Sequence, residues 1–192
     1  MDLVFATAML FLLAPILMLI FIAIKLDSTG PALYRQRRCF QQPFMVYKFR
    51  TMYLDLCSCD AVSEILQARR NDSRVTTVGS FLRRTSLDEL PQLVNVMRGE
   101  MSLVGPRPHA LAHDKEWEIL VGEVYLKRYR VKPGITGWAQ VNDLRGGAHT
   151  RTEIEARLEY DCFYVDNWSL LFDAKILFMT MRTVFFCHRN AC

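Results

Sequence analysis

The chain has 192 residues, of which 51% belong to the hydrophobic set and 23% are charged. This composition excludes an intrinsically disordered chain, and the length argues against two large independent domains. Residues 3–24 carry no charge and all but two belong to the hydrophobic set. We therefore expect one membrane-embedded segment, residues 1–26, followed by one domain, residues 27–192.

The charge of the chain is unevenly distributed. All 24 Lys and Arg residues lie at or after Lys25, together with 19 of the 20 Asp and Glu residues, so the chain from Lys25 onward has a net charge of +5. This excess favours an anionic partner, and its sign does not separate lipid headgroups, nucleotides and nucleic acid. Because no basic residue precedes the apolar segment, the positive-inside rule predicts that the domain faces the cytosol.

The apolar segment permits three arrangements. At about 1.5 Å per residue it reaches about 33 Å, which is enough to cross a hydrocarbon core of about 30 Å. Pro15 lies near its middle, and the missing backbone donor predicts a sharp bend there. A kinked transmembrane helix, a re-entrant hairpin and a buried core helix are all compatible with this pattern, whereas the flanking residues do not fit a cleaved signal peptide.

The six cysteines have no framework spacing, which indicates reduced thiols in a chain of this size. Cys57 and Cys59 have no second ligand pair at zinc-finger spacing, so we do not expect a zinc site. His109 and His113 have helical spacing, but two scattered surface histidines explain them better than a metal site does.

Past residue 30, the pattern predicts strands over 32–37 and 44–50 and helices over 60–70, 87–97, 151–160 and 168–186. The last helix has three charges, which favours packing in the core or in the membrane interface over a full span. Residues 105–108, Gly-Pro-Arg-Pro, predict a stiff non-helical arm that presents Arg107, because both prolines fix φ. Residues 132–138 predict a turn-rich loop.

The densest polar pattern is the run Arg-Arg-Thr-Ser-Leu-Asp-Glu-Leu-Pro at residues 83–91. Ser86 and Glu89 have the spacing of a capping box, whereas Asp88 as N-cap would place Pro91 in the tolerant first turn, so the register stays open. In either register two carboxylates lie near the start of the predicted helix, just after two arginines. Such a place favours an anion.

Adjacent residues diverge by about 100° around a helix, so Asp88 and Glu89 are expected to perform different tasks. In phosphoryl chemistry one carboxylate attacks while the other binds or orients a divalent metal. A carboxylate that approaches a diphosphate is repelled, so Mg²⁺ and several cationic side chains are required. The candidate cations are Lys48, Arg50, Arg83 and Arg107.

Four motifs then carry a family resemblance. They are YKFRTM at 47–52, TSLDELPQL at 85–93, MSLVGPRP at 101–108 and KPGITGWAQVN at 132–142. In this order they resemble the bacterial sugar transferases, also called monotopic phosphoglycosyl transferases, over residues 2–190. The resemblance implies transfer of a sugar 1-phosphate from a UDP-sugar to polyprenyl (undecaprenyl) phosphate with release of UMP, the first step of exopolysaccharide, O-antigen or glycoprotein assembly.

The resemblance also implies roles for acidic residues. Asp88 matches the nucleophile that forms a covalent phosphosugar intermediate, and Glu89 matches its neighbour at the Mg²⁺ site. Asp161 matches a further acidic residue of that site, so the implied metal-binding set is Asp88, Glu89 and Asp161.

The basic positions and the membrane bend are matched as well. Arg83 and Arg107 match phosphate-binding positions, and Lys48 lies in the basic strand motif. Pro15 matches the proline at which the re-entrant helix of the family bends. Many relatives have Ser before this proline, where this chain has Ala14, so the bend is expected to depend on Pro15.

The expected protein is α+β and mainly helical, with an N-terminal re-entrant membrane helix, a small catalytic domain on the cytosolic side and interfacial amphipathic helices. Its expected place is the bacterial inner (cytoplasmic) membrane. The expected partners are a UDP-sugar, polyprenyl phosphate and membrane lipid, with no nucleic acid, and the expected cofactor is Mg²⁺. The sequence leaves the sugar and the oligomeric state open, and sugar selectivity is expected in the loop 145–151.

Long family members have further transmembrane helices and a nucleotide-fold domain upstream, so this chain is expected to be either a short natural form or a catalytic part. Two other hypotheses compete with the transferase described above. One is a membrane-tethered basic protein that binds anionic lipid or nucleic acid, which predicts binding that weakens with salt. The other is an enzyme in which the lipid phosphate attacks the UDP-sugar directly in a ternary complex.

Overall fold

The computed structural model describes residues 1–54, 72–110, 117–144 and 150–186. Its helices are α1 (Asp2–Asp27), α2 (Thr77–Thr85), α3 (Leu93–Met97), α5 (Trp138–Val141), α6 (Arg151–Asp166) and α7 (Leu170–Phe186), with the 3-10 helices η1 (Leu87–Gln92) and η2 (Gly122–Arg130). Its strands are β1 (Leu33–Phe40), β2 (Gln42–Phe49), β3 (Ser102–Val104), β4 (His109–Ala110) and β5 (Gly134–Thr136). The predicted α+β, mainly helical class is confirmed, whereas the predicted helix 60–70 lies outside the described residues.

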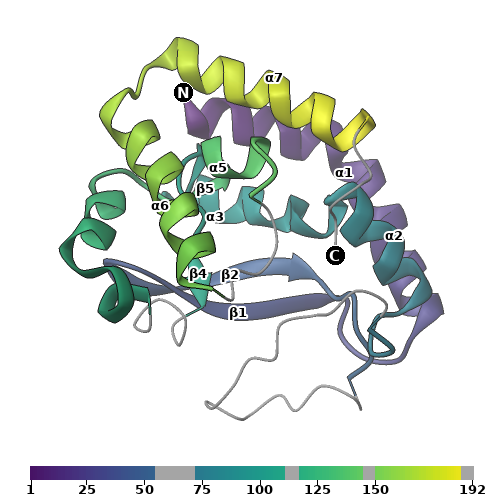
Figure 1. Ribbon diagram of the computed structural model, residues 1–192. Coiled ribbons are helices and arrows are strands. Elements are labelled where there is room, and N and C mark those ends of the chain that lie inside the picture. Colours follow the sequence, from purple (N-terminus) through teal and green to yellow (C-terminus); the bar gives the residue numbers. More distant parts are fainter. Residues whose placement is uncertain (55–71, 111–116, 145–149, 187–192) are drawn as a thin grey trace.

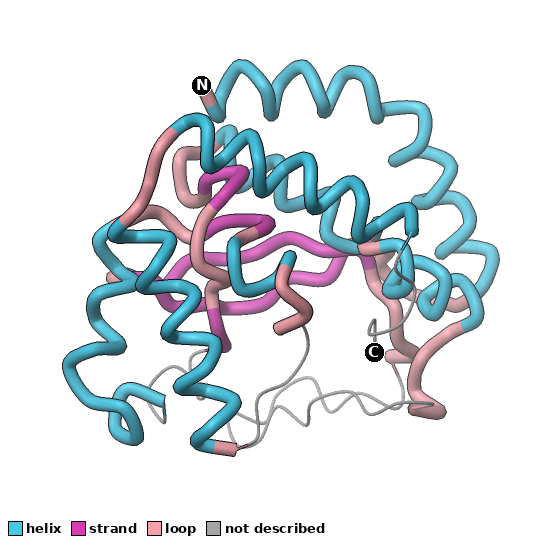
Figure 2. The backbone as a smooth tube through the Cα atoms, turned by 45° about the horizontal axis from the view of Figure 1, so that its top comes forward, coloured by secondary structure: helices cyan, strands magenta, loops and turns pink. Residues whose placement is uncertain are grey.

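Helix α1 is continuous through Pro15, and Figure 2 shows its path turning between the two ends. By length and composition it is apolar and long enough to cross a membrane. Only Ala6, Ile20 and Ile24 are buried along it, while large side chains such as Phe11 are exposed. The alternative of a buried core helix is therefore wrong, because most of the apolar surface of α1 faces away from the domain.

Strands β1 and β2 form an antiparallel hairpin that lies along the base of the helical layer (Figure 1). The register runs from Leu33 opposite Phe49 to Phe40 opposite Gln42, and Gln41 makes the turn with φ of 53°. β4 pairs with the other edge of β1, which gives the order β2-β1-β4. Both predicted strands are confirmed, and the hairpin extends beyond them to the turn.

The prediction of a turn-rich loop over 132–138 is wrong in its centre, where β5 pairs in parallel with β3. The glycines in this region permit close backbone approach instead of a succession of turns. A Cβ added to Gly134 would lie 2.1 Å from the backbone nitrogen of Gly105, and one added to Gly105 would lie 2.3 Å from the Lys132 carbonyl oxygen. This close packing fixes the segment that leads from β3 into residues 105–108.

The predicted helix 87–97 is divided into η1 and α3. Pro91 lies inside η1, where a ring without an N–H interrupts the α-helical hydrogen bonds. Ser86 precedes η1 in the left-handed conformation, with φ of 55°, and makes no side-chain cap hydrogen bond. The capping-box interpretation is therefore wrong, and the chain reverses at Ser86 so that η1 packs against β2.

Helices α6 and α7 confirm the two C-terminal helix predictions. α6 begins with a capping box between Thr150 and Glu153 and extends beyond the predicted end to Asp166. Ile176 of α7 is fully buried in the main apolar cluster, while Leu171 and Phe178 are exposed. α7 thus covers the core with one side and leaves an apolar side uncovered.

Candidate active site

Glu89 is bound by two cationic side chains from two other segments. Lys48 of β2 donates from Nζ to Glu89 Oε1 at 2.6 Å. Arg107 donates from Nη2 to Oε1 at 2.6 Å and from Nη1 to Oε2 at 3.0 Å, the two-pronged geometry that suits guanidinium and carboxylate. The side chains of Lys48 and Glu89 are each 15% exposed. Segments that are far apart in the sequence therefore meet at one half-buried carboxylate.

The β1–β2 hairpin and the arm after β3 fix the positions of the two cations in this cluster. Lys48 is opposite Tyr34 in the register, one residue from the buried end of β2, and η1 packs against this strand. Arg107 lies between Pro106 and Pro108 in an extended segment without helix. The structure confirms the predicted stiff arm, and the arm directs the guanidinium of Arg107 to Glu89.

Asp88 has a different environment from Glu89. Among the described residues its carboxylate makes no hydrogen bond and no ion pair. Burial and the adjacent negative charge of Glu89 raise the pKa of Asp88, although Lys48, Arg107 and Arg83 act in the opposite direction. Burial also disfavours the charge of Glu89, but Arg107 and Lys48 outweigh it and hold the pKa of Glu89 well below its ordinary value. Glu89 is thus held by two cations, whereas the carboxylate of Asp88 has no direct partner among the described residues.

Arg83 reaches this cluster from α2. Its Nε donates to Thr51 Oγ1 at 2.8 Å, and its charge acts on Asp88. The helix is held against the chain after β2, because a Cβ on Gly79 would lie 2.2 Å from the Thr51 carbonyl oxygen. The predicted residues that the fold brings together are Lys48, Arg83, Asp88, Glu89 and Arg107.

Arg50 is a predicted substrate-binding residue that binds the turn after α1 in the structure. It is 5% exposed. Its Nη2 donates to the carbonyl oxygen and to Oγ of Ser28, at 2.7 and 2.8 Å, and its Nη1 donates to the Thr29 carbonyl oxygen. Arg50 follows the end of β2 at Phe49, and it supplies donors to the backbone carbonyls of the turn after α1, which would otherwise lack them.

Asp161 also lies apart from the two carboxylates of η1. Its Oδ2 is 3.1 Å from Nη2 of Arg128, and these two side chains are 4% and 2% exposed. Burial raises the pKa of Asp161 against the effect of Arg128 and Arg157. No group of three or more His, Cys, Asp or Glu side chains in the described ranges could hold a metal ion. The expected set of Asp88, Glu89 and Asp161 is therefore not assembled, because Asp161 compensates a buried arginine.

The cysteine and histidine predictions fall partly outside the described residues, which exclude Cys57, Cys59 and His113. His109 is in β4 and not in a helix, and it is buried. Its ring packs against Trp117 with centroids 4.3 Å apart. Burial and nearby arginines, Arg128 first among them, hold the pKa of His109 well below its ordinary value. The interpretation of His109 as a surface histidine is therefore wrong, and it is a neutral core residue.

Arg38 is a residue of this region that the sequence analysis missed. Its Nη1 donates to the Pro108 carbonyl oxygen at 3.2 Å, and its Nη2 donates to Gln36 Oε1 at 2.6 Å. Burial and the charge of Arg107 lower the pKa of Arg38 to about 10, which keeps it protonated at neutral pH. Strand alternation from Tyr34 places Arg38 on the face that carries Lys48. The predicted strand ends at residue 37, one residue before Arg38, whereas the observed β1 continues to Phe40.

The two carboxylates of η1 suit a divalent cation of the Mg²⁺ type. Such ions are held by one or two carboxylates together with substrate phosphates and water. In the part of the chain that the structure describes, Asp88 has no competing partner and Glu89 Oε2 accepts a hydrogen bond from Arg107 alone. Both residues therefore retain oxygen lone pairs for a metal.

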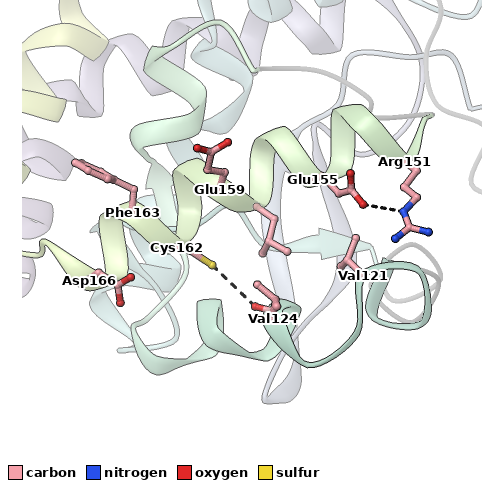
Figure 3. A pocket seen from close by; sticks show the side chains of 9 residues that line it. Val121, Val124, Arg151, Glu155, Glu159, Cys162, Phe163 and Asp166 are labelled. Carbon is pink, nitrogen blue, oxygen red and sulfur yellow. Dashed lines mark hydrogen bonds and ion pairs between the residues drawn. The ribbon is translucent and has the colours of Figure 1, made fainter.

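A separate groove of about 540 Å³ lies between η2 and α6 (Figure 3). Its charged lining is largely paired within the protein: Arg151 Nε is 2.7 Å from Glu155 Oε1, and Asp166 Oδ2 is 2.5 Å from Lys127 Nζ. Burial raises the pKa of the Cys162 thiol, so this cysteine is not a reactive thiolate. None of the predicted site residues lines the groove, which is therefore separate from the Asp88–Glu89 cluster.

Comparison with known proteins finds relatives that match most of the chain. A family model described as bacterial sugar transferase matches residues 1–187. A UDP-glucose:undecaprenyl-phosphate glucose-1-phosphate transferase of Escherichia coli K12 is 50% identical over 94% of this chain and 38% of its own length. A transferase of the same name from Caulobacter vibrioides is 49% identical over 96% of the chain and 68% of its own length. An exopolysaccharide production protein of Rhizobium leguminosarum is 44% identical over 94% and 90%. The chain thus spans less than two fifths of the Escherichia coli relative.

The position of Arg50 leads to a test that separates support of the fold from substrate binding. Arg50→Gln should lower the thermal unfolding temperature in detergent micelles, since buried acceptors left without donors cost about 1–3 kcal/mol each. For the release of UMP from a UDP-sugar that the family resemblance implies, its kcat/KM per mole of folded protein should stay within about twofold of wild type. Lys48→Gln is the matched comparison, with a large loss of kcat/KM. A stable Arg50→Gln variant with little activity would return Arg50 to the substrate site.

Proposed function

The chain belongs to the bacterial sugar transferase family, and on this premise we propose that it transfers a sugar 1-phosphate from a UDP-sugar to undecaprenyl phosphate with release of UMP. Two of the relatives above are named for UDP-glucose and for glucose 1-phosphate transfer. We therefore propose glucose 1-phosphate as the transferred group. The name of the Rhizobium relative supports exopolysaccharide synthesis as the process that uses the product.

The observation that carries the proposal is the unequal engagement of two adjacent carboxylates. Glu89 receives three hydrogen bonds from Lys48 and Arg107, which hold its position and reduce its basicity. Asp88 has no such partner among the described residues, and its pKa is raised. A more basic, unengaged carboxylate is the better nucleophile of the pair. Asp88 is therefore assigned the attack, and Glu89 the task of orientation.

The proposed reaction has two displacements at one phosphorus atom. An oxygen of the Asp88 carboxylate forms a bond to the sugar-bearing phosphorus of the UDP-sugar, and the bond to the bridging oxygen breaks as UMP leaves. A phosphate oxygen of undecaprenyl phosphate then bonds to the same phosphorus, and the bond to Asp88 breaks. The products are UMP and undecaprenyl diphosphate sugar, and the carboxylate of Asp88 is restored.

The cations of the cluster supply part of the charge that this reaction needs. Lys48, Arg83 and Arg107 bring three positive charges against the two carboxylates, Asp88 and Glu89. A net charge of +1 does not balance a diphosphate that carries about two negative charges, and displacement at phosphorus depends on such compensation. Mg²⁺ held by Asp88 and Glu89 would supply the remaining charge at the phosphate oxygens.

The proposal extends to a membrane-bound protein with its domain on the cytosolic side of the inner membrane. Ala6 of α1 belongs to the main apolar cluster, and Ile20 and Ile24 belong to a second cluster of the same domain. A straight transmembrane helix would carry one end away to the opposite side of the bilayer, whereas contacts of both halves with one domain favour a re-entrant helix that bends at Pro15. The exposed apolar side of α7, including Phe178, would then lie in the interface.

The competing hypothesis of a basic binding protein accounts less well for the cluster. A carboxylate at the centre of a surface that only binds anions would weaken that binding. Glu89 neutralises much of the charge of Lys48 and Arg107 in this way. That hypothesis predicts salt-sensitive binding without turnover of a nucleotide sugar. Measurement of UMP therefore separates the two.

The first prediction concerns the substrate. The protein in detergent micelles with undecaprenyl phosphate and Mg²⁺ should release UMP from UDP-glucose with a kcat/KM at least about tenfold above that for UDP-galactose, UDP-N-acetylglucosamine and UDP-N-acetylgalactosamine. A tenfold preference corresponds to about 1.4 kcal/mol in the transition state. Release of UMP from another sugar with higher efficiency would correct the sugar alone, while no UMP from any of them would refute the proposed function.

The second prediction concerns the nucleophile. Incubation with UDP-glucose before denaturation should leave a sugar phosphate on the peptide that contains Asp88, as read by mass spectrometry, and initial-velocity lines for the two substrates should be parallel. Asp88→Asn should abolish both the adduct and UMP release, because an amide cannot attack the phosphorus. The exposed Asp143→Asn is the matched control and should retain both. Intersecting lines without an adduct would favour direct attack by the lipid phosphate in a ternary complex.

The third prediction concerns the metal. Glu89→Gln should lower kcat and raise the Mg²⁺ concentration for half-maximal activity, because the neutral amide is a weaker oxygen ligand and loses its charge-assisted bonds to Lys48 and Arg107. The exposed Glu118→Gln should leave both quantities unchanged. A Glu89→Gln variant with the Mg²⁺ dependence of the wild type would remove Glu89 from the metal site.

A further inference from the structure

The arm that carries Arg107 has an unusual set of backbone partners. Pro106 and Pro108 have no N–H groups, so the arm cannot form a regular strand ladder. Its carbonyl groups are instead bound one by one. The backbone N–H of Gly134 donates to the Pro106 carbonyl oxygen at 3.0 Å, and Arg38 donates to that of Pro108. The carbonyl oxygen of Arg107 itself accepts a hydrogen bond from Nη2 of Arg128 at 2.5 Å.

Arg128 is in turn fixed by two buried partners. Its Nη1 donates to the hydroxyl of Tyr125 at 2.8 Å, one turn earlier in η2. Its Nη2, the group that binds the Arg107 carbonyl, is 3.1 Å from Asp161 Oδ2. Asp161 belongs to the buried side of α6, three residues before the fully buried Tyr164. Nη2 of Arg128 thus connects the carboxylate of Asp161 to the backbone of the arm at Arg107.

We propose that Asp161 is a positioning residue that acts through Arg128 on the backbone of Arg107 and so holds the Arg107 guanidinium on Glu89. The chain of contacts runs from α6 through η2 to the arm and ends at η1, without a metal ion. This assignment differs from the metal-site role that the family resemblance implied for Asp161. It rests on the proposed function in so far as the alignment of Arg107 and Glu89 serves the transfer reaction.

The geometry explains why such a support is required. Pro106 and Pro108 have no N–H groups, and the Gly105 N–H is already bound to the Thr136 carbonyl oxygen at 2.8 Å, so the orientation of Arg107 depends on what binds its carbonyl oxygen. Small displacements of a positioning group reduce catalysis by large factors, since the reacting atoms must be aligned. If Arg128 loses its charged partner, Tyr125 still holds Nη1, but Nη2 is no longer fixed on the Arg107 carbonyl oxygen. The Arg107 guanidinium is then held less firmly on Glu89.

The principal test compares two ion pairs that join the same two elements. Asp161→Asn removes the charge that fixes Arg128, and kcat should fall at least about tenfold with the Mg²⁺ concentration for half-maximal activity unchanged. Asp166→Asn removes the exposed partner of Lys127, also between α6 and η2, and should change kcat by less than about twofold. A raised Mg²⁺ requirement in Asp161→Asn would overturn the proposal in favour of a metal ligand.

A double-mutant cycle separates positioning from a general loss of stability. If Asp161 acts through Arg107, the loss caused by Asp161→Asn should largely disappear in an Arg107→Gln background, because the side chain that it positions is no longer there. A structural role would give additive losses in the two backgrounds, and additivity would contradict the proposal. Circular dichroism melts of all four proteins establish the folded fraction to which the rates are normalised.

A milder variant covers the case in which Asp161→Asn does not fold. Tyr125→Phe removes only the hydroxyl that anchors Arg128 and should produce a smaller fall in kcat, which should likewise vanish in the Arg107→Gln background. Amide hydrogen exchange of Gly105, Arg107 and His109 should be faster in Tyr125→Phe than in wild type and unchanged in Asp166→Asn. The exchange measurement does not depend on activity, so it separates two kinds of failure. Wild-type protein that releases no UMP would refute the proposed function. Unchanged exchange in Tyr125→Phe would refute the positioning role.

Discussion

The ionic contact of Glu89 with Lys48 and Arg107 is the interaction on which the rest of the site depends. It joins β2, η1 and the arm after β3, three segments that no local hydrogen-bond pattern connects. A half-buried carboxylate without partners would be unstable, and so would two half-buried cations, so each group requires the other two. Because Asp88 is adjacent in the chain, fixing Glu89 also fixes the direction in which Asp88 is presented.

The position of the arm that carries Arg107 also depends on contacts with distant segments. Two prolines make it stiff, and close packing of Gly105 against Gly134 determines where it leaves β3. Stiffness alone does not define orientation, however, and the carbonyl oxygens of the arm are bound by donors from β1, β5 and η2. Arg128 is the donor that connects the arm to the interior of α6. The site is therefore supported from the core outward, through backbone contacts as well as through side chains.

Helix α1 relates the site to its surroundings. Its two halves belong to two apolar clusters of one domain, while most of its large side chains are exposed. In water such a surface would promote association, whereas in lipid it is the expected surface of a membrane-inserted helix. The turn after α1 is held by Arg50, whose guanidinium binds the backbone at Ser28 and Thr29. The apolar helix α1 and the β1–β2 hairpin are thus connected at the turn that joins them.

The sequence by itself determined features with a local period or a local covalent cause: the strands over 32–37 and 44–50, the long helices, the stiff arm of Arg107 and the adjacency of Asp88 and Glu89. Motif order also identified the family. Only the tertiary structure decided the partners of the buried charges. Arg50 and Asp161 bind groups outside the Asp88–Glu89 cluster, and Arg38 binds the arm beside it. Residues 134–136 form a strand instead of a turn. The reason is that the state of a buried polar group depends on donors and acceptors supplied by distant segments, and spacing along the chain carries no information about which of these will meet it.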